Sequence, residues 1–249
     1  MPTVALRGLV VFPGMGISFD VGRARSLQAI KAAMAEDQQI FLVAQKDVRD
    51  DDPDMDRLYK TGTVAKISHI IRLPNSDTVR VSVDGISRAT MVDMLQIEPY
   101  LITDVKIRRE PAIRPEDRDY ATALVRQTKD YFEEYAEVVP QMPNEVLLDV
   151  LEKSKPSELA DYIGSNIILE YKKRQQILNE LNPLKRLEKV CCLLANEGDL
   201  IKLENEINQR VQENIDKSQR EYYLNEQMKI ISEELNDGNS PQAECEEFR

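Results

Sequence analysis

Apolar residues in the first half of the chain recur with the period of a β-strand. Residues 78–84 alternate between apolar and polar, as a strand with one buried face does, whereas 40–44 is continuously apolar, as a strand covered on both faces is. Residues 25–35 carry helical spacing, and 73–77 have the composition of a turn between two strands. We therefore expect 1–110 to form a small β-barrel of five or six short strands with one helix.

Beyond about residue 110 the apolar period changes to that of an α-helix. Prolines mark the predicted helix starts, and Asn182 is placed to cap the last helix. The expected helices are 115–138, 143–152, 156–168, 170–181 and 184–236. The predicted fold class is α+β: a barrel domain over 1–110, an all-α bundle over 115–183, a long helix over 184–236, and an acidic, disordered tail over 237–249.

The last predicted helix is too long for one compact domain, because about 50 residues at 1.5 Å each span roughly 75 Å. Its apolar residues lie on two faces, and we expect the first face to pack on the chain's own bundle. The first face comprises Leu200, Leu203, Ile207, Val211, Ile215 and Tyr222, and the second comprises Leu224, Met228, Ile231 and Leu235. Gly198 costs about 1 kcal/mol in a helix interior, so continuity there stays open.

The second face predicts contacts with another domain or another chain. Its flanking residues are densely charged, as they are in helices whose partner is not their own domain. The alternative is ordinary bundle core. The candidate contact residues are Tyr222, Tyr223, Leu224, Met228, Ile231 and Leu235.

Composition narrows the class of protein. The net charge is −11, with 44 acidic and 33 basic residues, which disfavours nonspecific binding to nucleic acid. No apolar run reaches the roughly 18 residues of a membrane span, and the opening residues do not resemble a leader. Three cysteines, two of them adjacent, form no disulfide framework, which favours a reducing compartment. We expect a cytoplasmic protein without membrane contacts.

Motifs for catalysis are missing from the sequence. The nine glycines form no phosphate-binding loop, and His69 is the only histidine, without a second metal-ligand motif near it. Residues 50–56 hold five aspartates but lack the spacing of a calcium loop, so they predict a solvated acidic loop. We expect no catalytic, cofactor-binding or metal-binding residues in this chain.

Two segments resemble the bacterial Lon proteases. Residues 219–229, QREYYLNEQMK, resemble the stretch that precedes the ATPase module in that family, and 6–15, LRGLVVFPGM, followed by 20–23, DVGR, resembles its opening. The segments stand about 200 residues apart and in the family's order. The resemblance covers nearly the whole chain.

This resemblance implies both a fold and a function. The barrel would be of the PUA-like type, and the chain would be the non-catalytic substrate-recognition and assembly region of an ATP-dependent serine protease. The full-length enzyme would be a cytoplasmic homohexamer that degrades misfolded and selected regulatory proteins. Its partners would be unfolded or degron-bearing substrates and further copies of itself. ATP and Mg would belong only to the full-length enzyme.

A docking surface for such substrates is expected on the barrel. The run from Leu6 to Phe12 is too apolar for simple alternation, and the adjacent Ile70 and Ile71 point to opposite faces of one strand. We name Leu6, Phe12, Ile71 and Ser82 as candidate substrate contacts.

Two other functions stay open. The first is a PUA-like nucleic-acid-binding module, supported by a basic cluster but opposed by the overall acidity and by the lack of interleaved aromatic residues. The cluster comprises Lys106, Arg108, Arg109 and Arg114. The second is a purely structural coiled-coil adaptor, which would leave the barrel without a role.

Overall fold

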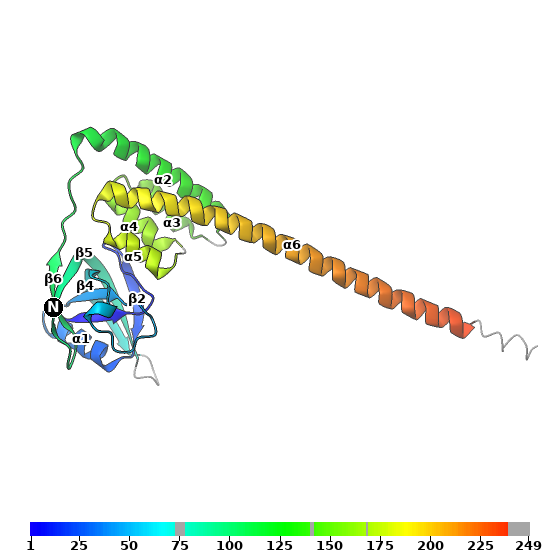
Figure 1. Ribbon diagram of the computed structural model, residues 1–249, viewed down its shortest axis with the longest axis horizontal. Coiled ribbons are helices and arrows are strands. Elements are labelled where there is room, and N and C mark those ends of the chain that lie inside the picture. Colours follow the sequence, from blue (N-terminus) through cyan, green and yellow to red (C-terminus); the bar gives the residue numbers. More distant parts are fainter. Residues whose placement is uncertain (73–77, 140–141, 168, 239–249) are drawn as a thin grey trace, which may run out of the picture. The chain divides into compact units, whose positions relative to one another are not determined.

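The computed structural model describes residues 1–72, 78–139, 142–167 and 169–238, with side chains described up to residue 233. The chain divides into one compact unit, Met1–Asn196, and a second unit that begins at Glu197. The first unit contains a mixed β-sheet followed by helices, and the second contains most of a long helix (Figure 1). The predicted α+β fold class is confirmed.

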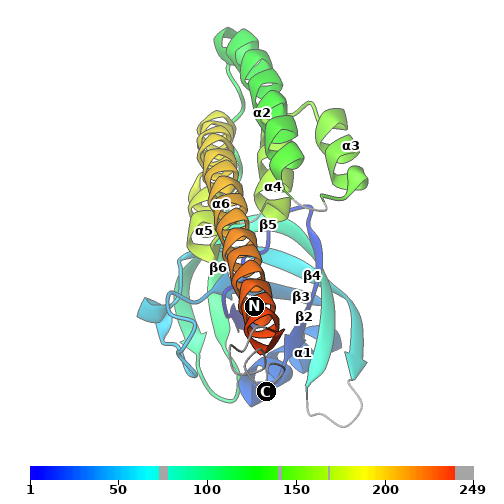
Figure 2. The same ribbon diagram turned by 90° about the vertical axis from the view of Figure 1, so that its right-hand side faces the viewer.

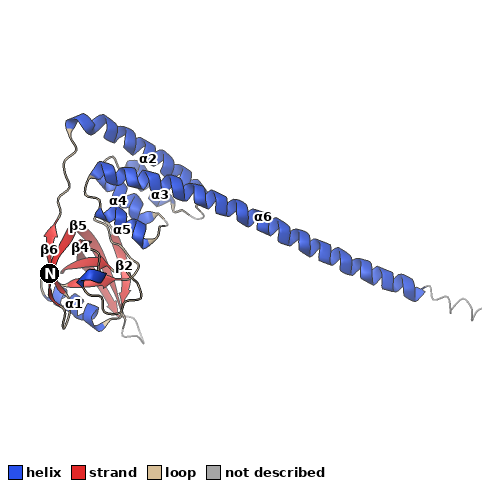
Figure 3. Cartoon of the chain, in the orientation of Figure 1, coloured by secondary structure: helices blue, strands red, loops and turns tan. Residues whose placement is uncertain are grey.

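Six strands and one helix make up the first part of this unit (Figure 3). The sheet has the order β1-β3-β4-β5-β2, and β6 pairs with a later part of β5 than β2 does. Only β1 and β3 run parallel. The elements are β1 (Thr3–Leu6), β2 (Gly16–Val21), α1 (Ala24–Ala35), β3 (Gln39–Ala44), a 3₁₀ turn η1 (Met55–Arg57), β4 (Thr61–Arg72), β5 (Val79–Gln96) and β6 (Ile102–Ile107).

The sheet closes on itself because β5, which pairs with β4 along one edge, is long enough to pair with two strands along the other. Its first half pairs with β2 and its second half with β6. β6 then reaches β1 through the bridge between Pro2 and Ile102. The Thr3 N–H donates to the Leu101 carbonyl at 2.9 Å, and the hydroxyls of Thr3 and Thr103 lie 2.7 Å apart. Strands β1, β3, β4, β5 and β6 therefore form a closed ring.

Two apolar clusters fill the barrel region, one on each side of β3. Ile40 and Leu42 join the cluster that α1 covers, whereas Phe41 and Val43 join the other. The prediction that 40–44 is covered on both faces is confirmed. The turn expected at 73–77 lies outside the described residues.

The helical part follows the predicted boundaries closely. Figure 2 shows α2, α4 and α5 grouped together. The Asn182 carboxamide accepts hydrogen bonds from the N–H groups of Leu184 and Lys185 at 3.0 and 3.2 Å, so it caps α6 as predicted. The elements are a 3₁₀ turn η2 (Pro115–Asp117), α2 (Arg118–Val138), α3 (Asn144–Glu152), α4 (Pro156–Asn166), α5 (Tyr171–Asn179) and α6 (Pro183–Gly238).

Helix α6 continues through Gly198, where a methyl group would meet no atom within 4 Å. The side chains that it buries are near its start, and the last of them is Leu194. The side chains of the first apolar face from Leu200 to Ile215 belong to the second unit and are 45–52% exposed, so their expected packing on the bundle stays a prediction.

Candidate functional site

The outer face of β2, β5 and β4 brings two of the four predicted substrate contacts together. Along one row Ile71 lies opposite Arg80, and Arg80 lies opposite Asp20; along the next row His69 and Ser18 flank Ser82. Residues opposite each other in register project to the same side of a sheet. We call this surface the outer face, comprising Ser18, Asp20, His69, Ile71, Arg80 and Ser82.

Side-chain contacts hold the polar part of the outer face in place. The guanidinium of Arg80 donates to both oxygens of Asp20, at 2.7 and 2.9 Å. The hydrogen bond from Arg80 holds the pKa of the Asp20 carboxyl below its ordinary value. The hydroxyls of Ser18 and Ser82 lie 2.7 Å apart. Ile71 is the apolar side chain here, and 58% of it is exposed.

The other two predicted contacts, Leu6 and Phe12, are buried. Leu6 belongs to the cluster beneath α1. Phe12 reaches α4, since its ring would lie 3.3 Å from a methyl group at Gly164. Leu6 and Phe12 therefore do not form the exposed apolar surface expected of them, because they pack in the interior and at the junction with α4.

A buried charge network, which the sequence did not reveal, lies at this same junction. Arg88 of β5 donates to both carboxylate oxygens of Asp161 in α4, one at 2.8 Å, and to the Leu178 carbonyl at 3.1 Å. Glu110 accepts from Arg88 at 3.0 Å and also from Arg186 of α6. Burial raises the pKa of the Asp161 carboxyl, and its hydrogen bonds with Arg88 oppose that rise. The network joins the barrel, the segment after β6, α4 and the start of α6.

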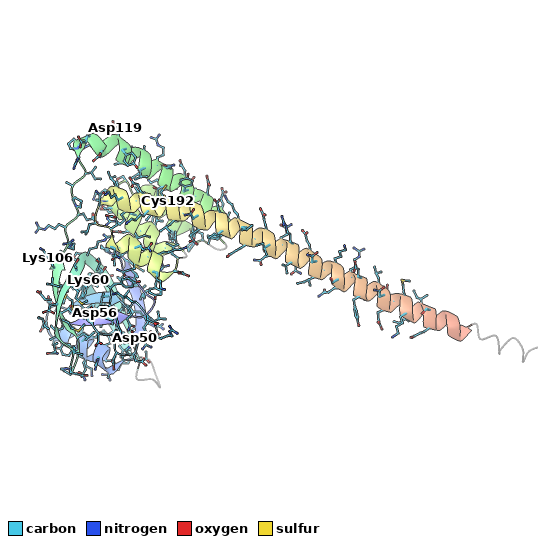
Figure 4. All side chains as sticks on the ribbon, in the orientation of Figure 1. Asp50, Asp56, Lys60, Lys106, Asp119 and Cys192 are labelled. Carbon is cyan, nitrogen blue, oxygen red and sulfur yellow. The ribbon has the colours of Figure 1, made fainter. Side chains whose placement is uncertain are left out.

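The acidic loop at 50–56 is held by arginines. Arg7 pairs with Asp51, Arg25 with Asp52, and Arg57 with Asp50. Figure 4 labels Asp50 and Asp56 in this region. Within the described residues, no group of three histidine, cysteine or acidic side chains is arranged to hold a metal ion.

The second predicted set of contacts lies on the distal part of α6. Tyr222, Tyr223, Leu224, Met228 and Ile231 are all exposed in this unit. Leu235 belongs to α6, but its side chain lies outside the described part of the chain. Figure 4 shows side chains projecting from this helix over the part whose side chains are described. None of the described helices combines the length and apolar composition needed to cross a membrane.

Comparison with known proteins identifies the family of this chain. Residues 1–196 match the family model described as the ATP-dependent protease La (LON) substrate-binding domain. The chain belongs to this family. The Lon protease of Brevibacillus choshinensis is 37% identical over 249 residues, an alignment that covers all of this chain and 32% of that protein. Lon protease 1 of Bacillus subtilis (strain 168) is 36% identical over 237 residues, covering 95% of this chain and 30% of that protein.

Solved structures agree on the Lon fold. The N-terminal domain of a Mycobacterium avium complex Lon protease superposes with a TM-score of 0.64 at 22% identity, covering 78% of this chain and 97% of that one. A Lon N-terminal domain protein from Xanthomonas campestris gives 0.52 at 16% identity, covering 77% and 96%. The resemblance drawn from the sequence is confirmed. The chain spans about a third of the length of the Lon proteases that it matches.

Proposed function

We propose that this Lon domain recognises protein substrates for an ATP-dependent serine protease and helps to assemble it. The family match over 1–196 carries the proposal, because the model is that of a substrate-binding domain. The substrates are unfolded or degron-bearing chains, among them misfolded and selected regulatory proteins. The enzyme acts as a homohexamer in the cytoplasm, and ATP and Mg act in its other modules.

The outer face supports the recognition half of the proposal. It presents Ile71 beside hydrogen-bonding groups at Ser18 and Ser82. An unfolded chain exposes apolar side chains together with unpaired backbone groups, so a mixed surface of this kind suits it. We propose Ile71 and Ser82 as contacts with such substrates.

The distal part of α6 supports the assembly half. Its exposed apolar residues have no cover within the described residues of the second unit. A neighbouring module or a second copy of the chain is the cover we propose. Within the full-length enzyme, Leu224→Asp or Met228→Asp should leave the fold intact but weaken hexamers or uncouple ATP hydrolysis from degradation, since each places a charge in an apolar interface. Assembly and degradation at wild-type levels in both variants would refute this role.

Binding of nucleic acid is the second candidate function, and the structure offers it little support. Arg114 pairs with Glu116, and Arg108 and Arg109 adjoin Glu110, an acceptor in the buried network. Asp104 lies two residues before Lys106 on the same strand, β6. Alternating charges of this kind do not form the continuous basic surface that binding to phosphates needs.

One titration series separates the two functions. Fluorescence anisotropy with labelled, unfolded casein should show saturable binding to the chain, whereas labelled single-stranded RNA should show none at physiological salt. Ile71→Ser should weaken casein binding several-fold, about 1 kcal/mol, because it removes an exposed apolar contact. The matched control is Leu148→Ser on α3, because Leu148 is 59% exposed, nearly the same as Ile71. Equal losses in both variants, or binding of RNA alone, would overturn the proposal.

A further inference from the structure

Strand β2 has one edge without a backbone partner among the described residues. It pairs with β5 alone, along its whole length from Gly16 to Val21. The Gly85 N–H donates to the Met15 carbonyl at 2.9 Å, so the odd-numbered residues of this segment turn their backbone groups towards β5. Backbone groups alternate sides along an antiparallel strand. Those of Gly16, Ser18 and Asp20 therefore point to the open edge.

This edge lacks the usual protection against a further strand. Proteins guard exposed edges with prolines, lysines, bulges or inward charges. The β2 sequence, GISFDV, holds no proline or lysine, and its register with β5 runs without a bulge. Its one charged residue, Asp20, is engaged by Arg80 through two hydrogen bonds. An extended chain can therefore approach without displacing an ionic barrier.

A cavity of about 380 Å³ lies beside the same strand. Its walls come from β1 and the residues after it, from β2 and the residues after it, and from Ser26 of α1. The lining is mixed: Leu6, Leu9 and Phe19 are apolar, whereas Arg7, Asp20 and Arg23 are charged. Leu9 and Phe19 are only partly buried, in contrast to the core that they pack against. The opposite side of β2 carries Ser18 and Asp20, which are exposed and polar. The edge thus lies between a hollow that holds apolar side chains among charged ones and a polar face.

We propose that β2 binds an extended segment of substrate polypeptide as an additional strand. Backbone groups of the segment pair with those of Gly16, Ser18 and Asp20, and every second side chain enters the cavity beside Phe19. This arrangement favours alternation: apolar residues on the cavity side, where they meet Leu9 and Phe19, and polar residues on the side of the outer face. Because backbone pairing is independent of side-chain identity, one site accommodates many unfolded sequences. The inference rests on the proposed function and specifies how it is carried out.

The test removes one edge donor while leaving the ladder with β5 intact. Ser18→Pro eliminates an N–H that points away from β5, a position at which an edge strand accepts proline. Ser18→Ala is the matched control, because it loses the same hydroxyl contact with Ser82 but keeps the N–H. The probe is a fluorescein-labelled peptide of alternating leucine and serine, and a second peptide of the same sequence carries N-methyl groups at every second residue.

We expect Ser18→Pro to bind the peptide about tenfold more weakly than Ser18→Ala does, because both variants lack the hydroxyl and only the proline variant lacks the N–H. The N-methylated peptide should bind the wild-type chain about tenfold more weakly than the unmodified peptide. This comparison does not depend on the folding of any variant. Equal binding of both peptides, or no effect of Ser18→Pro in a variant whose circular dichroism matches wild type, overturns the proposal. Casein binding that persists unchanged in Ser18→Pro also overturns it but leaves substrate recognition standing. A wild-type chain that binds neither casein nor peptide overturns both.

Discussion

Replacing Asp161 with asparagine should destabilise the fold far more than the same replacement at Asp20, whose pair with Arg80 is exposed. The carboxylate accepts two of the four hydrogen bonds that Arg88 donates, and Arg186 Nε lies 3.2 Å from it. The side chains of Arg88 and Asp161 are only 2% and 8% exposed, so water cannot replace the lost acceptor. Asparagine keeps one acceptor oxygen but turns an N–H₂ group towards a guanidinium. We expect a loss of about 3 kcal/mol, because breaking a buried ion pair leaves a charge uncompensated.

The control has the same chemistry in a different environment. Arg80 and Asp20 form the same two-bond pair, but their side chains are 49% and 44% exposed. Asp20→Asn should therefore cost less than about 1 kcal/mol. The chain has no tryptophan, so urea unfolding is followed by circular dichroism at a helical wavelength. Equal shifts of the two midpoints, at equal slopes, would refute the reasoning that burial sets the worth of the Asp161 pair.

Three further outcomes follow from local geometry. Gly198→Ala should stabilise the chain by up to about 1 kcal/mol of helix propensity and so raise its unfolding temperature. Gly85→Ala should lower the unfolding temperature strongly, since its methyl group would lie 2.1 Å from the Phe12 carbonyl oxygen. Thermal unfolding measures both. The hydrogen bond from Lys189 lowers the pKa of the Glu180 carboxyl, so the pair stabilises the fold above pH 4.5, the ordinary pKa, and this stabilisation is lost as the pH falls. Glu180→Gln should therefore be less stable than wild type, by under about 1 kcal/mol, only above that pH. A difference in stability that widens in acid would contradict this prediction. Amide hydrogen exchange should be about tenfold faster over 200–233 than over 184–194, because Leu194 is the last buried side chain of the helix. Uniform protection would mean that a partner covers the whole helix.

Periodicity predicted the elements of the fold well because local patterns determine them. The helix starts at prolines, the cap at Asn182 and the doubly covered strand at 40–44 each depend on residues close in sequence. The path of β5 was not predictable in this way. Its two partners stand far apart in the chain, and no local signal states that one strand will serve both β2 and β6.

The site was harder to predict, because the sequence does not show whether a long apolar run is exposed or buried. The run from Leu6 to Phe12 has the composition of a surface for binding and equally that of a segment covered on both sides. The structure shows the second for Leu6 and Phe12, because α1 covers Leu6 and α4 covers Phe12. The pairing of Arg88 with Asp161 was also hidden, since 73 residues separate them. Ile71 and Ser82 come together through strand register, which composition does not encode.

Closure of the barrel ring has a consequence for the order of folding. The contact between Thr3 and Thr103 joins positions 100 residues apart, whereas the helix contacts around Asn182 span only a few residues. Loop-closure entropy must be overcome before such a distant contact stabilises anything, so chains rich in distant contacts fold slowly. During synthesis, β1 cannot pair with β6 until β6 has been translated, whereas the helices that follow form quickly through their own local contacts. The barrel, although translated first, should therefore be the last part of this chain to reach its native state, and its strand edges should need protection from neighbouring nascent chains until then.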